Sequence, residues 1–376
     1  MDAAKKVSTI VITGGHVTPA LAVVSEIRRV HPDWRILWIG RRTALEGIAI
    51  ESEEYRLVRK QGIRFLTLTT GRFTRQWSLN TISSLVKIPV GYVQALFWLA
   101  RVRPTIIVSF GGYVALPVVV AGAILRIPSI THEQTHVPGL ANRIIAGFAQ
   151  RICVSFPETR ARFAKDKTVV TGLPIRHELL TAAKPLQASA TEPTPVVYIT
   201  GGSTGAVSLN TIVFPVVTHL TKTYIVIHQT GHPSFEQARS IRDDLPIVQK
   251  KRYIIAPFFD IEDLGGILRP ARIVIARAGA NTVWELALLA KVAILVPLPW
   301  SAGGEQKANA LWLAQNGGAV VLDQQGLTDA KMERTIHAMM ANYTRYQERA
   351  QRLSRTVPRK GSERFVEEIE QIVTSI

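Results

Sequence analysis

A segment in the second half of the chain, residues 278–288, has the residue types best suited to binding a phosphorylated ligand. It reads AGANTVWELAL and follows the apolar run IVIA at 273–276. A buried strand that ends at small residues and leads into a helix presents free backbone N–H groups and the positive end of the helix dipole, which suit phosphates. Glu285 lies inside the predicted helix, near enough to its start to reach ribose hydroxyls. We interpret this segment as a site for a sugar nucleotide.

Glycine-rich turns follow the first apolar run of each half of the chain. The sequence reads ITGGHVTPALAVV at 12–24 and ITGGSTGAVSLN at 199–210, a weak internal repeat of strand, Gly-Gly turn and helix. A dinucleotide-binding fingerprint is absent, because the first turn is not G-x-G-x-x-G and the second strand ends in Arg41 and Arg42 rather than an acid. A P-loop kinase is excluded because the sequence has no G-x-x-x-x-G-K-[ST] motif.

Strand-like apolar runs alternate with helical stretches along the whole chain, which predicts parallel sheets covered by helices on both faces. We predict an α/β fold of two doubly wound, Rossmann-like domains facing a cleft, with ligands at the carboxyl ends of the strands. The expected parts are an N-terminal domain at 1–180, a linker at 181–195, a C-terminal domain at 196–360, and a final helix at 361–376 that could pack back on the N-terminal domain. The expected strands are 7–13, 34–39, 105–109, 128–131, 151–155, 168–171, 196–200, 223–228, 252–256, 272–277, 292–297 and 319–322, with helices such as 19–30, 206–221 and 306–316 between them.

The chain of 376 residues has a net charge of +17, which calls for an anionic partner or a basic cellular setting. Nucleic acid is disfavoured, because the basic residues are spread along the chain without a zinc-finger, RNA-motif or basic-helix signature. An anionic membrane surface together with a phosphorylated substrate explains the charge better, and a generally basic proteome stays open. The single cysteine, Cys153, has no disulfide partner and gives no cysteine metal site.

Two apolar stretches, 85–100 and 105–126, resemble membrane-spanning helices in hydrophobicity. The first contains Lys87 and Pro89, which a spanning helix disfavours. The second has a Gly-Gly pair at its centre, so we predict a short strand, a turn at Gly111 and Gly112, and then a helix. We expect no transmembrane segment, and no signal peptide, because residues 1–6 lead directly into a strand-like run.

Nine motifs occur in order along the chain and carry a resemblance to a known family. They are TGGHVTPALAV (13–23), SFGGYVALP (109–117), HEQTHVPGLANR (132–143), GLPIR (172–176), GGSTGA (201–206), HQTG (228–231), DIEDL (260–264), ARAGANTVWEL (276–286) and GEQKANA (304–310). In these motifs the chain resembles the MurG family of peptidoglycan glycosyltransferases. That family transfers N-acetylglucosamine from UDP-N-acetylglucosamine to lipid I, giving lipid II. The resemblance implies the GT-B architecture and an inverting hexosyltransferase of cell-wall synthesis.

The resemblance places the donor nucleotide in the C-terminal domain. It implies that backbone groups of Ile261 bind uracil, that Glu285 accepts from the ribose hydroxyls and that Gln306 reads the hexose hydroxyls. Arg176 would add a cation beside the diphosphate, where a guanidinium binds phosphate in a bidentate manner. The implied donor residues are Thr13, Gly14, Gly15, Thr135, Arg176, Ser203, Ile261, Arg277, Gly279, Ala280, Asn281, Thr282, Glu285, Glu305 and Gln306.

The resemblance places lipid I in the N-terminal domain, where glycine turns let the backbone approach a diphosphate closely. His16 is our candidate base for the attack of the acceptor hydroxyl, and His132 is the second candidate. His16 could instead be a structural hydrogen-bonding residue in a helix cap. No metal or other cofactor is expected, since helix dipoles and Arg176 would stabilise the departing UDP. The implied acceptor residues are Gly14, Gly15, His16, Gly111, Gly112, Tyr113, His132, Glu133 and Gln134.

Residues 73–101 correspond to the place where the family carries an apolar patch ringed by basic residues. A surface-lying helix of this kind binds anionic lipid without crossing the bilayer. We expect peripheral attachment to the cytoplasmic face of the cell membrane, although the same side chains could be core. The candidate docking residues are Ile82, Leu85, Val86, Lys87, Val93, Phe97, Trp98 and Arg101.

The chain departs from the family pattern at several motif positions. Thr135, Leu173 and Thr204 stand where the family has amides, and a threonine hydroxyl has a shorter reach than an amide. Two alternatives therefore stay open: a related membrane glycosyltransferase with a diacylglycerol or polyprenyl acceptor, and a nucleotide-sugar-binding homologue without turnover. The retained GGH, GGY and HEQ turns favour lipid I, because a diglyceride has no diphosphate for them to bind.

Overall fold

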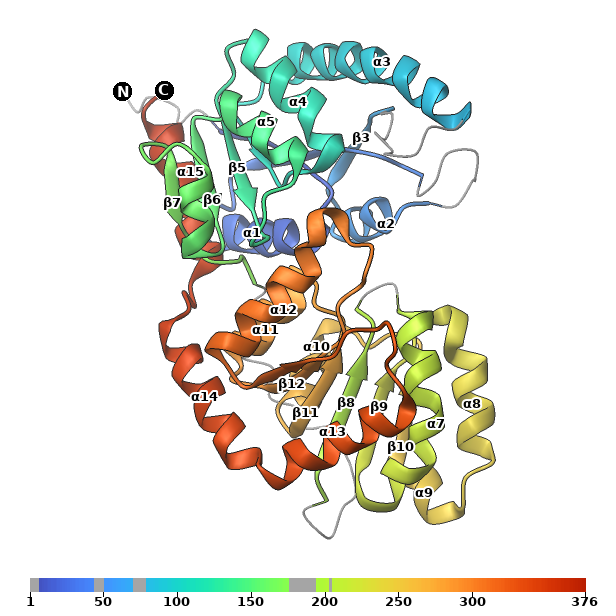
Figure 1. Cartoon of the computed structure of the whole chain (residues 1–376). Helices are drawn as coiled ribbons and strands as arrows, with labels where there is room; N and C mark the ends of the chain where they lie inside the picture. The colour runs from blue at the N-terminus through green and yellow to red at the C-terminus, as the bar shows by residue number, and fades with distance from the viewer. Residues whose placement is uncertain (1–6, 44–50, 70–78, 176–193, 203–204) are drawn as a thin grey trace. The chain divides into compact units, whose positions relative to one another are not determined.

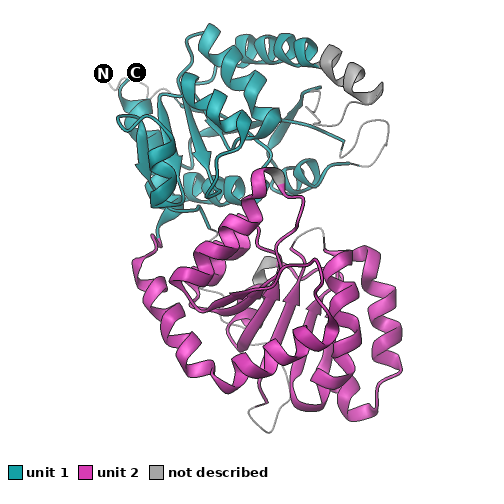
Figure 2. Ribbon diagram, viewed as in Figure 1, with its two compact units in different colours: residues 1–176, 360–376 teal, residues 177–359 magenta. Residues whose placement is uncertain are grey.

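The computed structural model contains two compact units, each built on one parallel sheet (Figures 1 and 2). It describes residues 7–43, 51–69, 79–175, 194–202 and 205–376, of which 79–87, 261–262 and 302 are described by their backbone only. Unit 1 is Met1–Arg176 with Lys360–Ile376, and unit 2 is His177–Arg359. Most of the expected linker lies outside the described residues, so the proposed domain boundaries stay predictions.

Unit 1 has its strands in the order β3-β2-β1-β4-β5-β6-β7. The strands are short runs of apolar and β-branched residues, which is typical of parallel strands buried on both faces. β1 lies between β2 and β4, with Thr13 beside Ser109 at its carboxyl end. The connections between strands run in opposite directions on the two sides of the β1–β4 pair. Open α/β sheets bind ligands at such a switch point. The strands are β1 (Thr9–Thr13), β2 (Arg35–Gly40), β3 (Arg64–Thr67), β4 (Ile106–Ser109), β5 (Ser129–Glu133), β6 (Arg151–Val154) and β7 (Thr168–Val170).

Helices cover both faces of this sheet, and successive strand residues alternate between the two layers. Ile10 and Ile12 pack in the core cluster that includes residues of α1, α2 and α15. Val11 faces the opposite cluster, formed with α3, α4 and α5. The helices are α1 (Val17–Val30), α2 (Glu53–Lys60), α3 (Leu79–Val102), α4 (Gly112–Ile124), α5 (Leu140–Phe148) and α15 (Gly361–Thr374), with a 3-10 helix, η1, at Pro157–Arg162.

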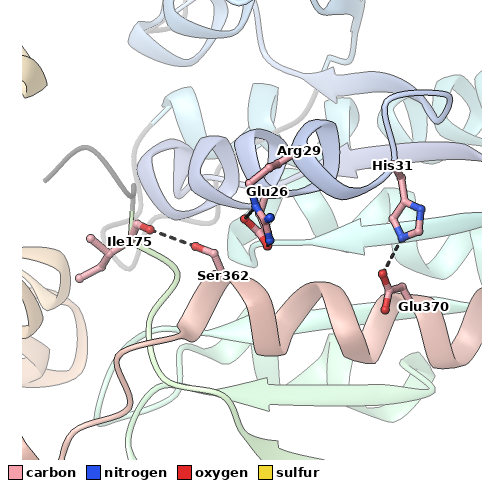
Figure 3. Close-up of polar contacts among 6 residues, drawn as sticks. All are labelled: Glu26, Arg29, His31, Ile175, Ser362 and Glu370. Atoms are coloured by element: carbon pink, nitrogen blue, oxygen red, sulfur yellow. Dashed lines mark hydrogen bonds and ion pairs between the residues drawn. The ribbon is translucent and has the colours of Figure 1, made fainter. Parts of the chain in front are cut away.

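The last helix, α15, belongs to unit 1 and packs beside α1 (Figure 3). Phe365 and Ile369 on its inner face are fully buried. At its start, Ser362 Oγ donates to the Ile175 carbonyl at 3.0 Å, and nearer its end Glu370 Oε1 lies 2.5 Å from His31 Nε2. The chain thus returns to its first unit after completing the second.

Unit 2 repeats the same arrangement, with strands in the order β10-β9-β8-β11-β12-β13. Its switch point lies between β8 and β11, where Thr200 is paired with Ala276. Val197 and Ile199 of β8 pack in one core cluster with residues of α7 and α13. On the other side α11 contacts both α12 and α14. The strands are β8 (Val196–Thr200), β9 (Ile225–Gln229), β10 (Tyr253–Ala256), β11 (Ala271–Ala276), β12 (Val292–Leu295) and β13 (Ala319–Val321).

The helices of unit 2 connect these strands in chain order. They are α7 (Val207–Thr223), α8 (Phe235–Asp243), α9 (Ile247–Arg252), α10 (Ile261–Leu268), α11 (Ala280–Leu288), α12 (Glu305–Asn316), α13 (Asp329–Ala341) and α14 (Tyr343–Thr356), with 3-10 turns η2 at His232–Ser234 and η3 at Ala302–Gly304.

The alternation predicted from the sequence is confirmed. Each expected strand is present, with ends shifted by at most two residues. Sequence reasoning missed β3, a four-residue strand that begins with a charged residue and is defined by its pairing with β2. The apolar stretch 105–126 forms β4, the glycine turn and α4, as predicted. Within the described part of the chain, every helix is too short or too polar to span a bilayer.

Candidate active site

The two glycine turns predicted in unit 1 meet at its switch point. Gly15 N donates to the Gly111 carbonyl at 3.0 Å, which joins the turn after β1 to the turn after β4. Gly14, Gly111 and Gly112 all have positive φ, at 141°, 68° and 79°, which favours glycine. A Cβ on Gly14 would lie 2.7 Å from the backbone carbon of Phe110. At these turns on the carboxyl edge of the unit 1 sheet, the glycines therefore place no side chain of their own over the backbone. A diphosphate can approach the backbone closely only in such an arrangement.

His16 follows the first turn and contacts a side chain from another strand. Its Nδ1 lies 2.7 Å from the amide nitrogen of Gln134, which comes directly after β5. His16 as a residue is partly exposed, whereas Gln134 is buried. Burial lowers the pKa of His16 to about 4, so the imidazole is neutral at pH 7.

His132 lies beneath this edge and is 1% exposed. Its Nε2 is 3.2 Å from the Gly172 carbonyl and 3.4 Å from Ser155 Oγ, and its ring packs near Phe110 and Phe365. Burial also lowers the pKa of His132 to about 4. Of the two candidate bases, His16 is the partly exposed residue and His132 the buried one, and the choice between them stays a prediction.

Glu133 is buried and its carboxylate is occupied by the loop that follows it. Oε1 accepts from the backbone N–H of Thr135 at 2.9 Å and from its hydroxyl at 2.7 Å. Oε2 accepts from Asn142 Nδ2 at 2.7 Å, and the same amide lies where a side chain on Gly111 would have to go. Burial raises the pKa of Glu133, and these hydrogen bonds oppose the rise. Glu133 and Thr135 thus shape the turn, and their contacts with ligand stay predictions.

Two further predicted residues of unit 1 have defined surroundings. Tyr113, in the first turn of α4, lies under the guanidinium of Arg41, with Cζ 5.4 Å from the ring centroid. Such a cation–π contact places a positive charge beside the glycine turns. The Thr13 hydroxyl is buried and has no hydrogen-bond partner among the described residues.

The equivalent turn of unit 2 follows β8 and is held by the strand beside it. Gln229 Nε2 donates to the Gly202 carbonyl at 2.9 Å, and its Oε1 accepts from Phe259 N at 3.1 Å. A Cβ on Gly205 would lie 2.7 Å from Gly231 Cα, and φ at Gly205 is 75°. The HQTG motif therefore positions the GGSTGA turn. Ser203 itself lies outside the described residues.

The helix expected to bind phosphate begins where the sequence predicts. Gly279 is the N-cap of α11, and Ala280, Asn281 and Thr282 form its first turn. A glycine N-cap has no side chain to occupy the first N–H groups, so these groups and the helix dipole can act on an anion. Glu285 lies one turn further along and is partly exposed.

Arg277, expected to bind the donor, links three segments of unit 2. Nη1 donates to the Val296 carbonyl at 2.9 Å, while Nη2 donates to Ser208 Oγ and Gln324 Oε1, both at 2.6 Å. These acceptors are neutral, and burial lowers the pKa of Arg277. The guanidinium thus fixes the carboxyl end of β11 to α7, and a contact with the donor stays a prediction.

Glu305 and Gln306 begin α12 after two glycines with positive φ, Gly303 and Gly304. Gln306 Oε1 accepts from Leu298 N at 3.0 Å, which orients the side chain against the loop after β12. Ile261 is the first residue of α10, so its backbone lies at a helix start. Arg176 and the Ile261 side chain lie outside the described residues. Across the described part of the chain, no group of three or more His, Cys, Asp or Glu could hold a metal ion.

Comparisons with known proteins match both units. The model of the glycosyltransferase family 28 N-terminal domain matches residues 9–154, and the model of that family's C-terminal domain matches residues 196–367. UDP-N-acetylglucosamine--N-acetylmuramyl-(pentapeptide) pyrophosphoryl-undecaprenol N-acetylglucosamine transferase of Desulfotalea psychrophila is 32% identical over 334 residues, or 88% of this chain and 86% of the relative. The Clostridium botulinum protein of the same name is 32% identical over 339 residues, or 89% and 90%. The crystal structure of Acinetobacter baumannii MurG is 27% identical, with a TM-score of 0.73, and covers 97% of this chain and 99% of that chain.

The chain belongs to the MurG family of glycosyltransferase family 28. The predicted GT-B architecture of two Rossmann-like units is therefore confirmed. In this MurG-family chain, the glycine turns after β1, β4 and β8 and the start of α11 lie at the switch points of the two sheets.

Several residues that hold this MurG-family site have no role predicted from the sequence. Asn142 supports Gly111 and Glu133, and Gln229 supports Gly202. Asn210 Nδ2 donates to the Thr230 carbonyl at 2.7 Å, beside Gly205. Asn142 and Gln229 stand inside the quoted LANR and HQTG segments, and their position as polar residues in buried surroundings is the signal that could have identified them.

Proposed function

We propose that this chain transfers N-acetylglucosamine from UDP-N-acetylglucosamine to the C4 hydroxyl of N-acetylmuramic acid in lipid I, giving lipid II. One observation carries the proposal: each unit presents a glycine turn at its switch point, in a chain 32% identical to transferases named for this reaction. Two diphosphate-bearing substrates fit two such edges, because glycine lets the backbone approach each diphosphate closely. A diacylglycerol acceptor would leave the edge of unit 1 without an anion.

The donor lies on unit 2 in this proposal. The first turn of α11 and Ser203 bind the diphosphate, and the helix dipole stabilises the charge on UDP as it leaves. Glu285, one turn into the helix, accepts from the ribose hydroxyls. The backbone of Ile261 binds uracil, Gln306 binds the hexose, and Arg176 adds a cation beside the diphosphate.

The acceptor lies on unit 1, with its diphosphate on the glycine cluster of Gly14, Gly15, Gly111 and Gly112. His16 Nε2 takes the proton of the C4 hydroxyl as that oxygen attacks the anomeric carbon. The bond from the anomeric carbon to the UDP oxygen breaks, and its electron pair leaves with UDP. The His16 imidazole is unprotonated at pH 7, as a proton acceptor must be.

The transfer assay is the direct test. Labelled N-acetylglucosamine is supplied as UDP-N-acetylglucosamine with a short-chain lipid I analogue, and the native protein is compared with Glu285→Ala and His16→Ala. We expect Glu285→Ala to weaken UDP binding, and His16→Ala to lower kcat about 10²–10⁴-fold with donor binding retained. Glu348→Ala, at an exposed position of α14, is the matched control and should change neither.

Two results would reassign the activity. Binding of UDP-N-acetylglucosamine by the native protein without transfer would favour a binding-only homologue, with Thr135 and Leu173 as the first residues to restore. Transfer to diacylglycerol in place of lipid I would favour the related glycosyltransferase.

Attachment to an anionic membrane surface through α3 is a further part of the proposal. Val93 and Phe97 are 65% and 59% exposed, and Arg101 is exposed one turn later. Trp98 is anchored differently, because its Nε1 donates to the Thr67 carbonyl at 3.1 Å. Apolar side chains beside a cation suit the headgroup boundary of a bilayer. Ile82, Leu85, Val86 and Lys87 have side chains outside the described part.

Vesicle sedimentation tests this attachment. We expect the protein to sediment with phosphatidylglycerol vesicles more than with phosphatidylcholine vesicles, and Phe97→Ser to reduce the bound fraction. Ile247→Ser replaces an exposed apolar residue of unit 2 and serves as the control. An equal loss of the vesicle-bound fraction in both variants would show that α3 is not the attachment site.

A further inference from the structure

The contact between His16 and Gln134 contains an unsatisfied atom. The Gln134 amide nitrogen is placed toward His16 Nδ1 at 2.7 Å, and in this placement Gln134 Oε1 is buried with no hydrogen-bond partner among the described residues. A buried acceptor without a partner costs about 1–3 kcal/mol. The two ends of a carboxamide have the same shape, so a half-turn of the amide exchanges them.

The end of the amide that faces His16 decides which ring nitrogen carries the proton. If the amide nitrogen faces the ring, Nδ1 must accept and the proton sits on Nε2, which then has no lone pair for the acceptor hydroxyl. If Oε1 faces the ring, Nδ1–H donates to it and Nε2 is free to accept. The imidazolium formed after proton transfer also carries Nδ1–H, so the same Oε1 serves both forms without moving.

The groups around His16 make Gln134 the available partner for this role. The carboxylate next to Gln134 in the sequence, Glu133, is already bonded to Thr135 and Asn142. His132, the titratable ring whose charge couples to His16, is buried and bonded to Gly172. A carboxylate in this position would favour the charged imidazolium. A neutral carboxamide can fix the position of the proton on the ring without that effect.

We propose that Gln134 is a positioning residue whose Oε1 accepts the Nδ1–H of His16 and so keeps Nε2 unprotonated toward the acceptor. This inference rests on the proposed function of His16 as base. Gln134 affects the reaction only through the imidazole of His16. The contact between these two side chains joins the carboxyl ends of β1 and β5.

The position of the proton can be measured without substrate. In protein labelled with ¹⁵N-histidine, the nitrogen shifts distinguish a protonated from an unprotonated ring nitrogen, and His16→Gln identifies the signals. We expect Nδ1 of His16 to be protonated and Nε2 to be free at pH 7. Protonation of Nε2 in the native protein would overturn the proposal, whatever the enzyme transfers.

Kinetics give a second and separate readout. Gln134→Leu keeps the approximate size of the side chain without its hydrogen bonds, and we expect kcat to fall about 10–100-fold with the KM for UDP-N-acetylglucosamine unchanged. Gln134→Glu restores an acceptor but adds charge, so kcat should recover at high pH, with the acid limb of its pH profile moved upward. Unchanged kcat in Gln134→Leu, or an unmoved profile in Gln134→Glu, would refute the role. A native protein without transfer would instead refute the proposed function, while the nitrogen shifts would still test the pairing.

Discussion

Two adjacent glycines, Gly14 and Gly15, have different surroundings and so offer a matched test of the turn after β1. Gly14 has φ at 141°, and a Cβ there would lie 2.7 Å from C and 2.8 Å from Cα and N of Phe110. Phe110 cannot move away easily, because its N–H donates to the Thr13 carbonyl at 2.8 Å and its side chain is buried. A Cβ on Gly15 would meet nothing within 4 Å.

The expected costs follow from these distances. For Gly14→Ala, the strained backbone costs about 1–3 kcal/mol and the overpacking against Phe110 about 1–3 kcal/mol, giving about 2–6 kcal/mol in total. For Gly15→Ala, a surface substitution in open space changes stability by only about 0.5 kcal/mol. The two substitutions add the same methyl group one residue apart.

Urea unfolding followed by circular dichroism, together with the transfer assay, separates stability from function. We expect Gly14→Ala to lower the unfolding midpoint and to lose activity. Gly15→Ala should keep the native midpoint but raise the KM for the lipid acceptor, because its methyl group enters the space proposed for the diphosphate. Equal midpoints for the two variants would refute the reasoning from Phe110, and an unchanged acceptor KM in Gly15→Ala would refute the placement of the diphosphate.

Three further outcomes are expected. Phe365→Ala should reduce the free energy of unfolding by about 3–5 kcal/mol in urea titrations, since the ring is fully buried between Phe110 and His132; a loss below 1 kcal/mol would contradict the packing of α15 on unit 1. Burial raises the pKa of Glu54 from 4.5 to about 7, so the folded state holds a proton that the unfolded state has released and stability should fall as pH rises between these values. At about 1.4 kcal/mol per pH unit the loss is slightly more than about 3 kcal/mol, and Glu54→Gln should remove this part of the pH dependence of unfolding. Arg277→Lys should lower the melting temperature measured by calorimetry, because an ammonium cannot span the three acceptors at Val296, Ser208 and Gln324; an unchanged melting temperature would show that the links are not needed.

The sequence by itself determined the strand and helix alternation, the two glycine turns and the family. These features are local: β-branched runs flanked by glycine and amphipathic stretches predict the strands and helices, and the motifs keep their order along the chain. The start of α11 at Ala280, one residue after the glycine that caps it, could be predicted because small residues after an apolar run mark such a boundary. β3 could not be predicted, since its four residues begin with a charged side chain and are too few to show a strand pattern.

The tertiary structure alone decided which side chains meet. His16 and Gln134 are 118 residues apart in sequence, and Ser362 and Ile175 are 187 apart. The family resemblance implies ligand contacts for Glu133 and Arg277, which stay predictions, and the fold in addition gives each of them protein partners. Periodicity reports which face of an element is buried, but the partner of a polar group depends on strand order and helix packing. Strand order and helix packing arise from contacts between residues distant in sequence. The hydrogen bonds at the carboxyl edge of each sheet depend on that packing.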